Sequence, residues 1–394
     1  MKILFYQWKA YLFEDVYQTL LSMGHEVTLL NEQLKNIEED AAYTEMLRSR
    51  LMEESFDFLF SINFSPVLAT ACHDADTLYV SWSCDSPLLA MYHEAIFYPT
   101  NVIFLFDQSN VAEFKRLGVT NLHHLPLAVH TERLSAQIAC REKIYPVSFV
   151  GNLYEHNSFD EIAPNLPPYL YGYLECAMEA QLRVSGGNLL EELLTEEICG
   201  MLEELTDYHQ SEKSFAGIKA LFANTVLGFK TASLKRIRSL GALAYFLKQD
   251  NMVPQPAVHL FTESTAQELP GVCLHPPVDY LKEMPQIFHD SAVNLNFTIP
   301  GIRTGIPLRV WDILGSGGFA LTNYQPELEQ YFTFGKELDV FEDTGELLEK
   351  AAFYLKHEEL RQKIAGQGQQ LVSREHNYGV RLKELFAVLK QYLF

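Results

Sequence analysis

Two arginines lie where a bound diphosphate would need them. Arg303 is in a loop rich in glycine and proline, and Arg309 is in the first turn of a short helix that Pro307 is expected to begin. A cation at a helix N-terminus opposes the helix dipole, typically by about 0.3–1 kcal/mol. A diphosphate drawn to the same place by the dipole and by free N–H groups would offset that cost. Arg309 is therefore expected to stabilise charge on a leaving diphosphate during catalysis.

Asp312 and Ser316 follow Arg309 on the same face of this helix, at spacings of three and seven residues. The Asp312 carboxylate could bind hydroxyl groups and the Arg309 cation could bind phosphate, a combination that suits a nucleotide-sugar. The alternative interpretation is a surface Arg–Asp pair on an ordinary crossover helix. The residue pattern alone leaves both interpretations open.

The segment around the helix predicts how these side chains are positioned. Residues 292–297 alternate apolar and polar side chains and predict a buried strand, with Asn294 and Asn296 expected to line the pocket. The three glycines after the helix, Gly315, Gly317 and Gly318, end it, and residues 319–322 begin the next strand. The segment predicts a strand–loop–helix–strand unit of a parallel sheet.

A second phosphate-binding feature is predicted after another strand. Gly151 and Asn152 follow the apolar residues 147–150, so that backbone N–H groups there could approach a phosphate. Gly186 and Gly187 do not form a phosphate loop, because no strand precedes them; they are expected to separate two helices.

Polar residues also follow the predicted strands of the N-terminal half. In open α/β sheets, ligands bind beyond the carboxyl ends of the strands. We expect Asp85 to orient or deprotonate an acceptor hydroxyl there. Alternatively, Asp85-Ser86-Pro87 caps and begins the next helix, and both interpretations can hold. The residues expected to bind the acceptor are Gln7, Trp8, Asn63, Trp82 and Asp107.

The sequence predicts no metal site. The six cysteines are scattered without a CxxC pair, which favours reduced thiols. Asp74-Ala75-Asp76 lies between a predicted helix and a strand start, so it is interpreted as a turn. His123 and His124 are interpreted as one packed and one exposed histidine. The cysteines are Cys72, Cys84, Cys140, Cys176, Cys199 and Cys273.

Length and charge limit the function classes. A chain of 394 residues favours two domains. The net charge of −21 argues against nucleic acid and against an anionic membrane surface as partners, but not against a small anionic ligand. A signal peptide is not apparent, and no apolar run approaches the roughly 20 residues that span a bilayer. A cytoplasmic protein is expected.

Strands and helices alternate through the first part of the chain, and residues 130–145 are polar enough for a linker. A second sheet is predicted from residue 147 onwards, interrupted by a helical stretch over residues 158–248. The last predicted helix covers residues 380–394. This organisation predicts two α/β domains, which many two-domain nucleotide-binding proteins share.

The segment Gly305–Thr322 resembles the donor-site signature of CgeB-like (spore maturation protein) glycosyltransferases, relatives of a large retaining GT-B family. The family motif has two glutamates. The alignment places Asp312 at the second, which holds the nucleotide ribose, and Thr304 at the first. Further similar segments are residues 79–87, 104–107, 124–128, 324–332, 335–338, 354–355 and 375–376.

The resemblance implies a GT-B fold, with two Rossmann-like domains facing each other across a cleft. Residues 1–142 would form the acceptor domain, with the last helix, 380–394, packed back on it. Residues 143–379 would form the donor domain and include the helical stretch 158–248. His275 and the two prolines after it lie where GT-B enzymes place a base-binding loop, although two prolines also simply form a turn.

Two departures from the family pattern concern the donor. Thr304 is not an acid, and no lysine or arginine follows Gly151 within a few residues. Phosphate neutralisation would then depend on Arg309, on Arg303 or on the basic segment that contains Arg236 and Arg238.

The sequence therefore predicts a glycosyltransferase that moves a sugar from a nucleotide-sugar, expected to be UDP-linked, to a protein or cell-envelope glycan. The resemblance favours a retaining reaction, and neither a metal nor another cofactor is expected. One alternative is a non-catalytic GT-B-like partner that binds a nucleotide-sugar for another glycosyltransferase. A second alternative is a sugar-nucleotide epimerase.

Overall fold

The structure is a computed structural model that describes residues 1–139, 142–206, 213–249, 253–264 and 269–393. The chain folds into two compact units. The described part of the first unit is residues 1–128, 213–217 and 378–393, and the remaining described residues form the second unit.

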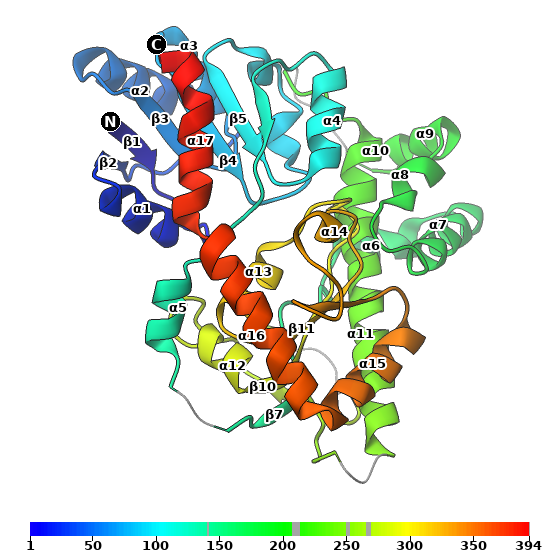
Figure 1. Cartoon of the computed structure of the whole chain (residues 1–394). Coiled ribbons are helices and arrows are strands. Elements are labelled where there is room, and N and C mark those ends of the chain that lie inside the picture. The colour runs from blue at the N-terminus through cyan, green and yellow to red at the C-terminus, as the bar shows by residue number, and fades with distance from the viewer. Residues whose placement is uncertain (140–141, 207–212, 250–252, 265–268, 394) are drawn as a thin grey trace. The chain divides into compact units, whose positions relative to one another are not determined.

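The first unit is built on a parallel sheet of six strands in the order β2-β1-β3-β4-β5-β6 (Figure 1). The inner strands β3, β4 and β5 are buried along their whole length, as expected for a sheet covered on both faces. The elements are β1 (Lys2–Tyr6), α1 (Phe13–Ser22), β2 (Glu26–Leu30), α2 (Ala41–Glu53), β3 (Phe58–Ile62), α3 (Pro66–Asp74), β4 (Tyr79–Ser83), the 3₁₀ turns Leu89–Met91 and Glu94–Phe97, β5 (Asn101–Leu105), α4 (Gln108–Arg116), β6 (Leu122–His124) and α17 (Tyr378–Leu393).

The last helix, α17, packs on this first sheet and its helices, far from its neighbours in sequence. Phe386 lies 4.5 Å from the His25 ring and 6.4 Å from the Phe58 ring, measured between ring centroids. Tyr392 forms a 3.0 Å hydrogen bond with His123 on β6. The chain therefore returns to its first unit at its end.

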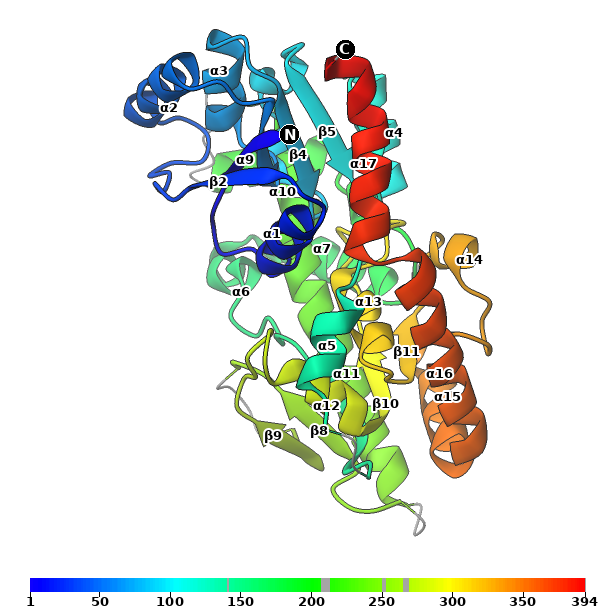
Figure 2. The same cartoon turned by 60° about the vertical axis from the view of Figure 1, so that its left-hand side comes forward.

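The second unit has a parallel sheet of six strands in the order β12-β11-β10-β7-β8-β9 (Figure 2). Its strands are β7 (Tyr145–Val150), β8 (Val258–Phe261), β9 (Val272–His275), β10 (Ser291–Asn296), β11 (Ala320–Asn323) and β12 (Asp339–Phe341). Its helices outside the insertion are α5 (Thr131–Gln137), α12 (Met284–Asp290), α13 (Leu308–Gly315), α14 (Leu328–Tyr331), α15 (Thr344–Lys356) and α16 (Glu358–Glu375).

A helical insertion separates β7 from β8. Its long helix α11 packs on α7 and α15 and on strands β8 and β9, so the insertion is joined to the sheet along one helix. Its elements are α6 (Ser158–Ile162), a 3₁₀ turn (Ala163–Asn165), α7 (Pro168–Gln181), α8 (Leu189–Leu193), α9 (Glu196–Leu205), α10 (Ile218–Leu221), a π-helical turn (Phe222–Val226) and α11 (Leu227–Lys248).

Three local expectations differ from the structure. The segment expected to be a linker contains helix α5, and Leu134 of this helix packs against α13. Just before α5, Val129 donates its N–H to the His376 carbonyl. The second unit accordingly begins at residue 129 and not at residue 143. Pro307 is the N-cap of α13 and not its first helical residue. No helix begins at Asp85, because the chain stays non-helical until the 3₁₀ turn at Leu89. Cys140 lies outside the described residues.

Candidate functional site

Helix α13 is held tightly at its C-terminal end. A Cβ on Gly315 would lie 2.5 Å from a methyl carbon of Val129 and 2.9 Å from one of Leu134, so only glycine allows α5 to approach this closely. Gly317 has φ +70°, a left-handed conformation that ends the helix as glycine readily does. The glycines predicted to stop the helix thus also fix its position in the second unit.

Arg309, in the first turn of α13, lies against α12. Its guanidinium carbon is 5.6 Å from the centre of the Phe288 ring, and one guanidinium nitrogen contacts the sulfur of Met284. Among the described residues, no acidic side chain pairs with it. Its positive charge is therefore held by an aromatic ring and a thioether and is not neutralised by a carboxylate.

Arg236, on α11, is a second cation of this kind and the more deeply buried one. Its guanidinium donates to the carbonyl oxygens of Asn152, at 2.5 Å, and Phe297, at 2.7 Å. It also lies 4.7 Å from the centre of the Tyr154 ring. Its Nε–H is buried without a hydrogen-bond partner.

The charge of Arg236 is uncompensated within the described residues. Burial lowers the pKa of its guanidinium, Tyr154 acts in the opposite direction, and the positive charge of Arg309 lowers the pKa further. The two arginines are thus close enough to repel each other. A buried cation without an acidic partner is costly unless an anion joins it. Asn152 and Phe297 follow the carboxyl ends of β7 and β10, which is where parallel sheets bind ligands.

The loop after β7 positions Arg236 instead of supplying N–H groups to a phosphate. The Gly151 N–H donates to the Phe261 carbonyl at 3.0 Å, and the Asn152 side-chain oxygen accepts from the Tyr154 N–H at 2.5 Å. The prediction that backbone N–H groups of Gly151 and Asn152 approach a phosphate is therefore wrong for Gly151, because its N–H is already bonded within the sheet. Asn152 contributes through its carbonyl oxygen, which holds the arginine.

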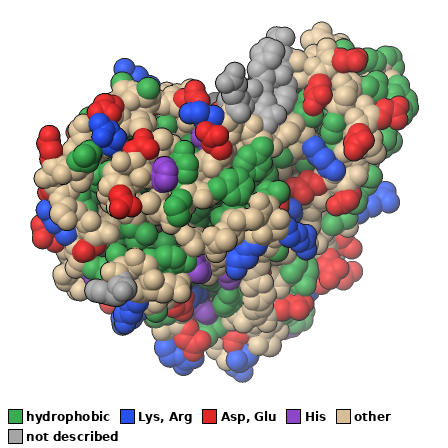
Figure 3. Space-filling view, turned by 90° about the horizontal axis from the view of Figure 1, so that it is seen from above, with side chains coloured by type: hydrophobic (Ala, Val, Ile, Leu, Met, Phe, Trp, Pro, Cys, Tyr) green, Lys and Arg blue, Asp and Glu red, His purple; other side chains and the backbone are tan. Residues whose placement is uncertain are grey.

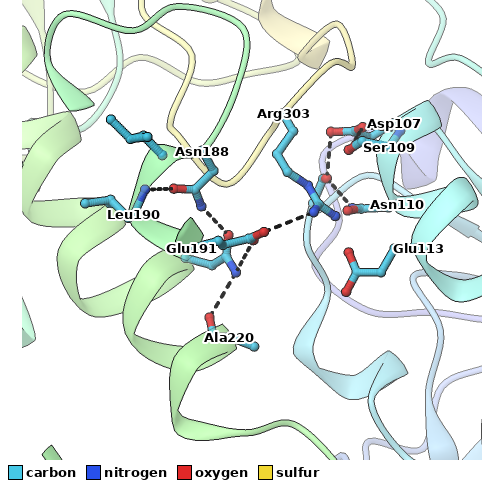
Figure 4. A network of polar contacts seen from close by, with 12 residues as sticks. Asp107, Ser109, Asn110, Glu113, Asn188, Leu190, Glu191, Ala220 and Arg303 are labelled. Atoms are coloured by element: carbon cyan, nitrogen blue, oxygen red, sulfur yellow. Dashed lines mark hydrogen bonds and ion pairs between the residues drawn. The ribbon is translucent and has the colours of Figure 1, made fainter. Parts of the chain in front are cut away.

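Arg303 has an acidic partner, unlike the other two arginines. Its guanidinium forms a 3.1 Å ion pair with Glu191 on α8 (Figure 4). Asn224 donates to the same carboxylate at 3.2 Å. Asn188, the N-cap of α8, in turn donates to Asn224 at 2.9 Å. Arg303 therefore connects its loop to the helical insertion, and it is not a diphosphate ligand in this arrangement.

An acid lies beside Thr304 although the sequence has none at that position. The Thr304 hydroxyl donates to the Glu327 carboxylate at 2.7 Å, and the Glu327 N–H donates to the Thr304 carbonyl at 3.1 Å. Glu327 is only 1% exposed. Sequence reasoning missed this residue, because it comes 23 positions later in the chain and only the fold brings it close.

Asp312 and Ser316 are both buried. Tyr280 donates its hydroxyl to the Asp312 carboxylate at 3.1 Å. The Ser316 hydroxyl donates to the Asp312 backbone carbonyl at 2.8 Å and completes the end of α13. Asp312 thus accepts a hydrogen bond from a tyrosine hydroxyl, and its role toward a ribose stays a prediction, whereas Ser316 has a structural role that the sequence did not predict.

Asn294 and Asn296 support the sheet and do not line a pocket, which corrects the prediction. Asn294 is 1% exposed, accepts from the Ser148 hydroxyl at 3.0 Å and donates to the Phe288 and Phe319 carbonyls. Asn296 is also buried and donates to the hydroxyls of Thr298 and Thr322. Their side chains are already used between neighbouring strands.

In the first unit, Asp85 and Asn63 form a pair at the carboxyl ends of β3 and β4. Asn63, at φ +64°, donates its amide to the Asp85 carboxylate at 2.7 Å and accepts from the Cys84 N–H at 2.9 Å. Asp85 is an exposed residue, yet burial of its carboxyl raises the pKa of that group, and the Asn63 hydrogen bond acts in the opposite direction. A carboxylate with a raised pKa that solvent can reach suits a general base.

A cavity of about 340 Å³ lies next to this pair, within the first unit. Trp8 forms part of its wall and donates its indole N–H to the Ile62 carbonyl at 2.7 Å. Gln7, the preceding residue, is not among the lining residues, and its backbone carbonyl accepts from the Gln33 side chain at 2.7 Å. The cavity is lined by Tyr6, Trp8, Gln33, Leu34, Lys35, Ile37, Ile62, Asn63, Phe64, Ser65 and Leu68.

Comparison with known proteins shows what the sequence and the fold of this chain resemble. Residues 244–387 match a family model described as glycosyl transferase-like. A glycosyltransferase from Rickettsia africae ESF-5 superposes with a TM-score of 0.53 at 8% identity, over 100% of this chain and 98% of that chain. The fold is GT-B.

Two other solved structures have the same fold. HepE of Anabaena, in complex with UDP-glucose, superposes with a TM-score of 0.53 at 10% identity and covers 99% of this chain and 100% of that chain. A protein described as a putative UDP-N-acetylglucosamine 2-epimerase from Listeria monocytogenes superposes with a TM-score of 0.51 at 9% identity. The superposition covers 99% of this chain and 96% of that chain. A comparison with curated proteins found no match. The glycosyl transferase-like domain and the GT-B fold support a glycosyltransferase.

Two of the expected acceptor ligands of this GT-B protein are core residues. Trp82 is 0% exposed, donates its indole N–H to the Leu125 carbonyl at 3.1 Å and packs against Tyr378. Asp107 is also 0% exposed and caps α4 by accepting from the Ser109 N–H at 2.9 Å. Neither side chain reaches an acceptor, so both predictions are wrong.

Trp82→Ala is expected to destabilise the protein by about 3–5 kcal/mol, because it leaves a large cavity in the core. Chemical denaturation would measure the change. A variant with normal stability and a raised acceptor KM would contradict the structural role of Trp82. Trp82→Phe, which leaves a smaller cavity, is the matched control and should lose less stability.

The surface and the remaining motifs of the GT-B chain add three points. In the view of Figure 3, the described Lys and Arg side chains are interspersed with Asp and Glu and do not form a continuous basic patch. Among the described helices, none is long and apolar enough to cross a membrane. Asp74 ends α3 and Asp76 has φ +49°, so this segment is a turn, as predicted.

His275 faces an aromatic and histidine cluster on the sheet. Its ring is stacked on Phe261, with centroids 4.4 Å apart, and its Nε2 lies 2.9 Å from Nδ1 of His259. The following residues lead to Tyr280, which contacts Asp312. The segment after β9 thus reaches helix α13, but the His275 side chain itself points to a different cluster.

Proposed function

We propose that the protein is a glycosyltransferase that takes a sugar from a UDP-linked donor bound to its second unit and transfers it to an acceptor bound to its first. The observation that carries the proposal is the pair of arginines, Arg236 and Arg309. They lie near each other without acidic partners among the described residues, at the carboxyl edge of a GT-B sheet. In HepE, a protein of the same fold, the bound molecule is UDP-glucose.

The arginines would act on the leaving group. As the bond from the sugar to the diphosphate breaks, negative charge grows on the diphosphate oxygens. Fixed guanidinium groups in a site with little water stabilise that charge most when it has developed fully. We propose that Arg309 and Arg236 supply this charge, so that the transfer itself needs no divalent metal.

Asp312 would fix the nucleotide. A carboxylate can accept about four hydrogen bonds, and Asp312 already accepts one from the Tyr280 hydroxyl. We propose that the ribose hydroxyls bind the same carboxylate. The family motif places an acid at the position of Thr304. In this chain Glu327, which is bonded to Thr304, would supply the acid near the donor sugar instead.

The acceptor would bind in the cavity beside Trp8, with its hydroxyl oriented by Asp85. The cavity combines aromatic walls with the polar side chains of Gln33, Lys35 and Asn63, which suits a sugar or an amphipathic group. A surface protein or a cell-envelope glycan fits this description. The resemblance to retaining enzymes leads us to propose that the anomeric configuration is kept. The free cysteines Cys72, Cys84, Cys176, Cys199 and Cys273 suit a cytoplasmic location.

The experiment that tests the function is incubation of the purified protein with a panel of nucleotide-sugars. Slow release of free UDP without an acceptor, accelerated when an acceptor glycan or protein is added, is the expected result. An isomerised sugar nucleotide would instead identify an epimerase. Tight binding with no release under any acceptor would identify a non-catalytic partner.

Trp8→Ala is expected to raise the acceptor KM about 10-fold with little change in the donor KM, because it removes one wall of the acceptor cavity. Steady-state kinetics with each substrate varied in turn would measure this. Tyr11→Ala is the control, since Tyr11 is an exposed aromatic in the same unit that does not line the cavity. Equal effects from both variants would argue against this acceptor site.

A further inference from the structure

Three side chains with metal-binding atoms converge on the neighbouring strands β8 and β9. His259 on β8 is paired in register with Cys273 on β9, and His275 is two residues beyond Cys273, on the same face of its strand. One ligand atom from each residue lies within 4.8 Å of the other two. The sequence gives little signal of this, because the Cys-x-His pair gains its third member only through strand pairing.

The two imidazoles are nearly at the spacing of ligands to one metal ion. Nδ1 of His259 and Nε2 of His275 are 2.9 Å apart. Tetrahedral zinc with Zn–N bonds of roughly 2.0–2.1 Å holds two nitrogens about 3.3 Å apart. A shift of about 0.4 Å would therefore place both nitrogens on a zinc ion.

A backbone carbonyl sets the tautomer of His259. Its Nε2 lies 3.0 Å from the Pro256 carbonyl oxygen, which can only accept, so Nε2 carries the proton and the Nδ1 lone pair faces His275. Metal-binding histidines commonly donate their second nitrogen to such a carbonyl. Gln255 fixes the segment by donating to the carbonyls of Leu247 and Val253.

Aromatic rings hold the imidazoles, while the cysteine keeps the cluster accessible. His275 is stacked on Phe261, and the Tyr145 ring lies 4.9 Å from His259, edge to face. His259 is buried, whereas Cys273 and His275 are partly exposed on the edge strand β9. An ion could thus enter from solvent and find two ligands already oriented.

We propose that His259 Nδ1, Cys273 Sγ and His275 Nε2 bind a zinc ion, with water as a fourth ligand. Two imidazoles and a thiolate suit zinc and similar ions, whereas Mg²⁺ and Mn²⁺ prefer oxygen ligands. On binding, the thiol proton passes to solvent, and His275 exchanges its Nε2 proton for one on Nδ1. The proposal does not depend on the transferase activity. The ion would anchor the end of β9. The chain leads from there to Tyr280, whose hydroxyl contacts the Asp312 carboxylate.

Cobalt titration of the full chain, after chelator treatment, tests the proposal. Co²⁺ is expected to give intense visible bands of a tetrahedral site and a near-ultraviolet thiolate charge-transfer band, both abolished when Zn²⁺ displaces it. Cys273→Ser should remove the charge-transfer band, and His275→Gln should weaken Zn²⁺ binding at least about 10-fold. Cys176→Ser, which changes an exposed cysteine on α7, should change neither.

Two results would overturn the site: no charge-transfer band in the wild-type protein, or a band that persists in Cys273→Ser. If Cys273→Ser does not fold, X-ray absorption of the Co²⁺-loaded wild type decides. One sulfur with two imidazole nitrogens in the coordination shell supports the proposal, and a shell of oxygen and nitrogen alone contradicts it.

Discussion

Arg309→Ala is expected to lower donor turnover, measured as kcat/KM, by about 10²–10³-fold while the fold survives. Removing one fixed group that stabilises charge in the transition state typically has an effect of this size. The fold should persist because Arg309 is only half-buried, and its contacts are one ring and one sulfur atom. Steady-state kinetics with the nucleotide-sugar, together with circular dichroism and thermal unfolding, would measure both parts of the prediction.

Arg238→Ala is the matched control. Arg238 lies on α11 two residues after Arg236, but its side chain is exposed and paired with Glu179 at 2.7 Å. Surface ion pairs of this kind contribute about 0–1 kcal/mol to stability. Turnover close to wild type is expected for this variant. Normal turnover in Arg309→Ala, or an equal loss in both variants, would remove the arginine from the mechanism.

Asp85→Asn is expected to lower kcat by about 10²–10⁴-fold, the range that a positioned general base contributes. The replacement keeps the shape of the side chain, and an Asn oxygen can still accept from the Asn63 amide, so the loop should keep its structure. Donor binding, measured by titration calorimetry with UDP, should stay unchanged, because this residue belongs to the first unit. A variant with wild-type kcat would contradict the role of Asp85.

The raised pKa of Asp85 gives this prediction a pH dependence. The base works in its ionised form, so kcat/KM should fall on the acidic side with an apparent pKa above the usual value of about 3.9. A folded-state pKa above the unfolded value stabilises the fold only at low pH, and this contribution is lost as pH rises through the folded pKa. Asp85→Asn should therefore be no less stable than wild type at neutral pH. The size of any gain should be small, because the side chain is exposed.

The sequence predicted the fold because its signals are local. Apolar runs of strand length, glycines after helices and the strand–loop–helix–strand unit around α13 all depend on residues close together in the chain. The same locality explains why the helix with Arg309 and Asp312 was predicted well, with a one-residue difference at Pro307. Asn63 and Asp85 were also singled out from the sequence, because each lies just after a buried strand, and the structure joins them by a hydrogen bond.

Contacts between distant segments could not be predicted in this way. Arg236 reaches the strand ends from a helix 84 residues after Asn152, and the partner of Arg303 lies 112 residues away in the insertion. Trp82 looked like a ligand because it ends a strand, but a parallel sheet covered on both faces buries side chains on either side of the strand. Glu327 and the His259–Cys273–His275 cluster also arise only from tertiary packing and strand pairing.

The most direct test of the central claim is a crystal structure of the protein with UDP. The account predicts that the diphosphate lies within hydrogen-bond distance of the Arg309 guanidinium and close to Arg236, with the ribose hydroxyls on the Asp312 carboxylate. UDP bound elsewhere in the chain, with both guanidinium groups left without an anion, would contradict it.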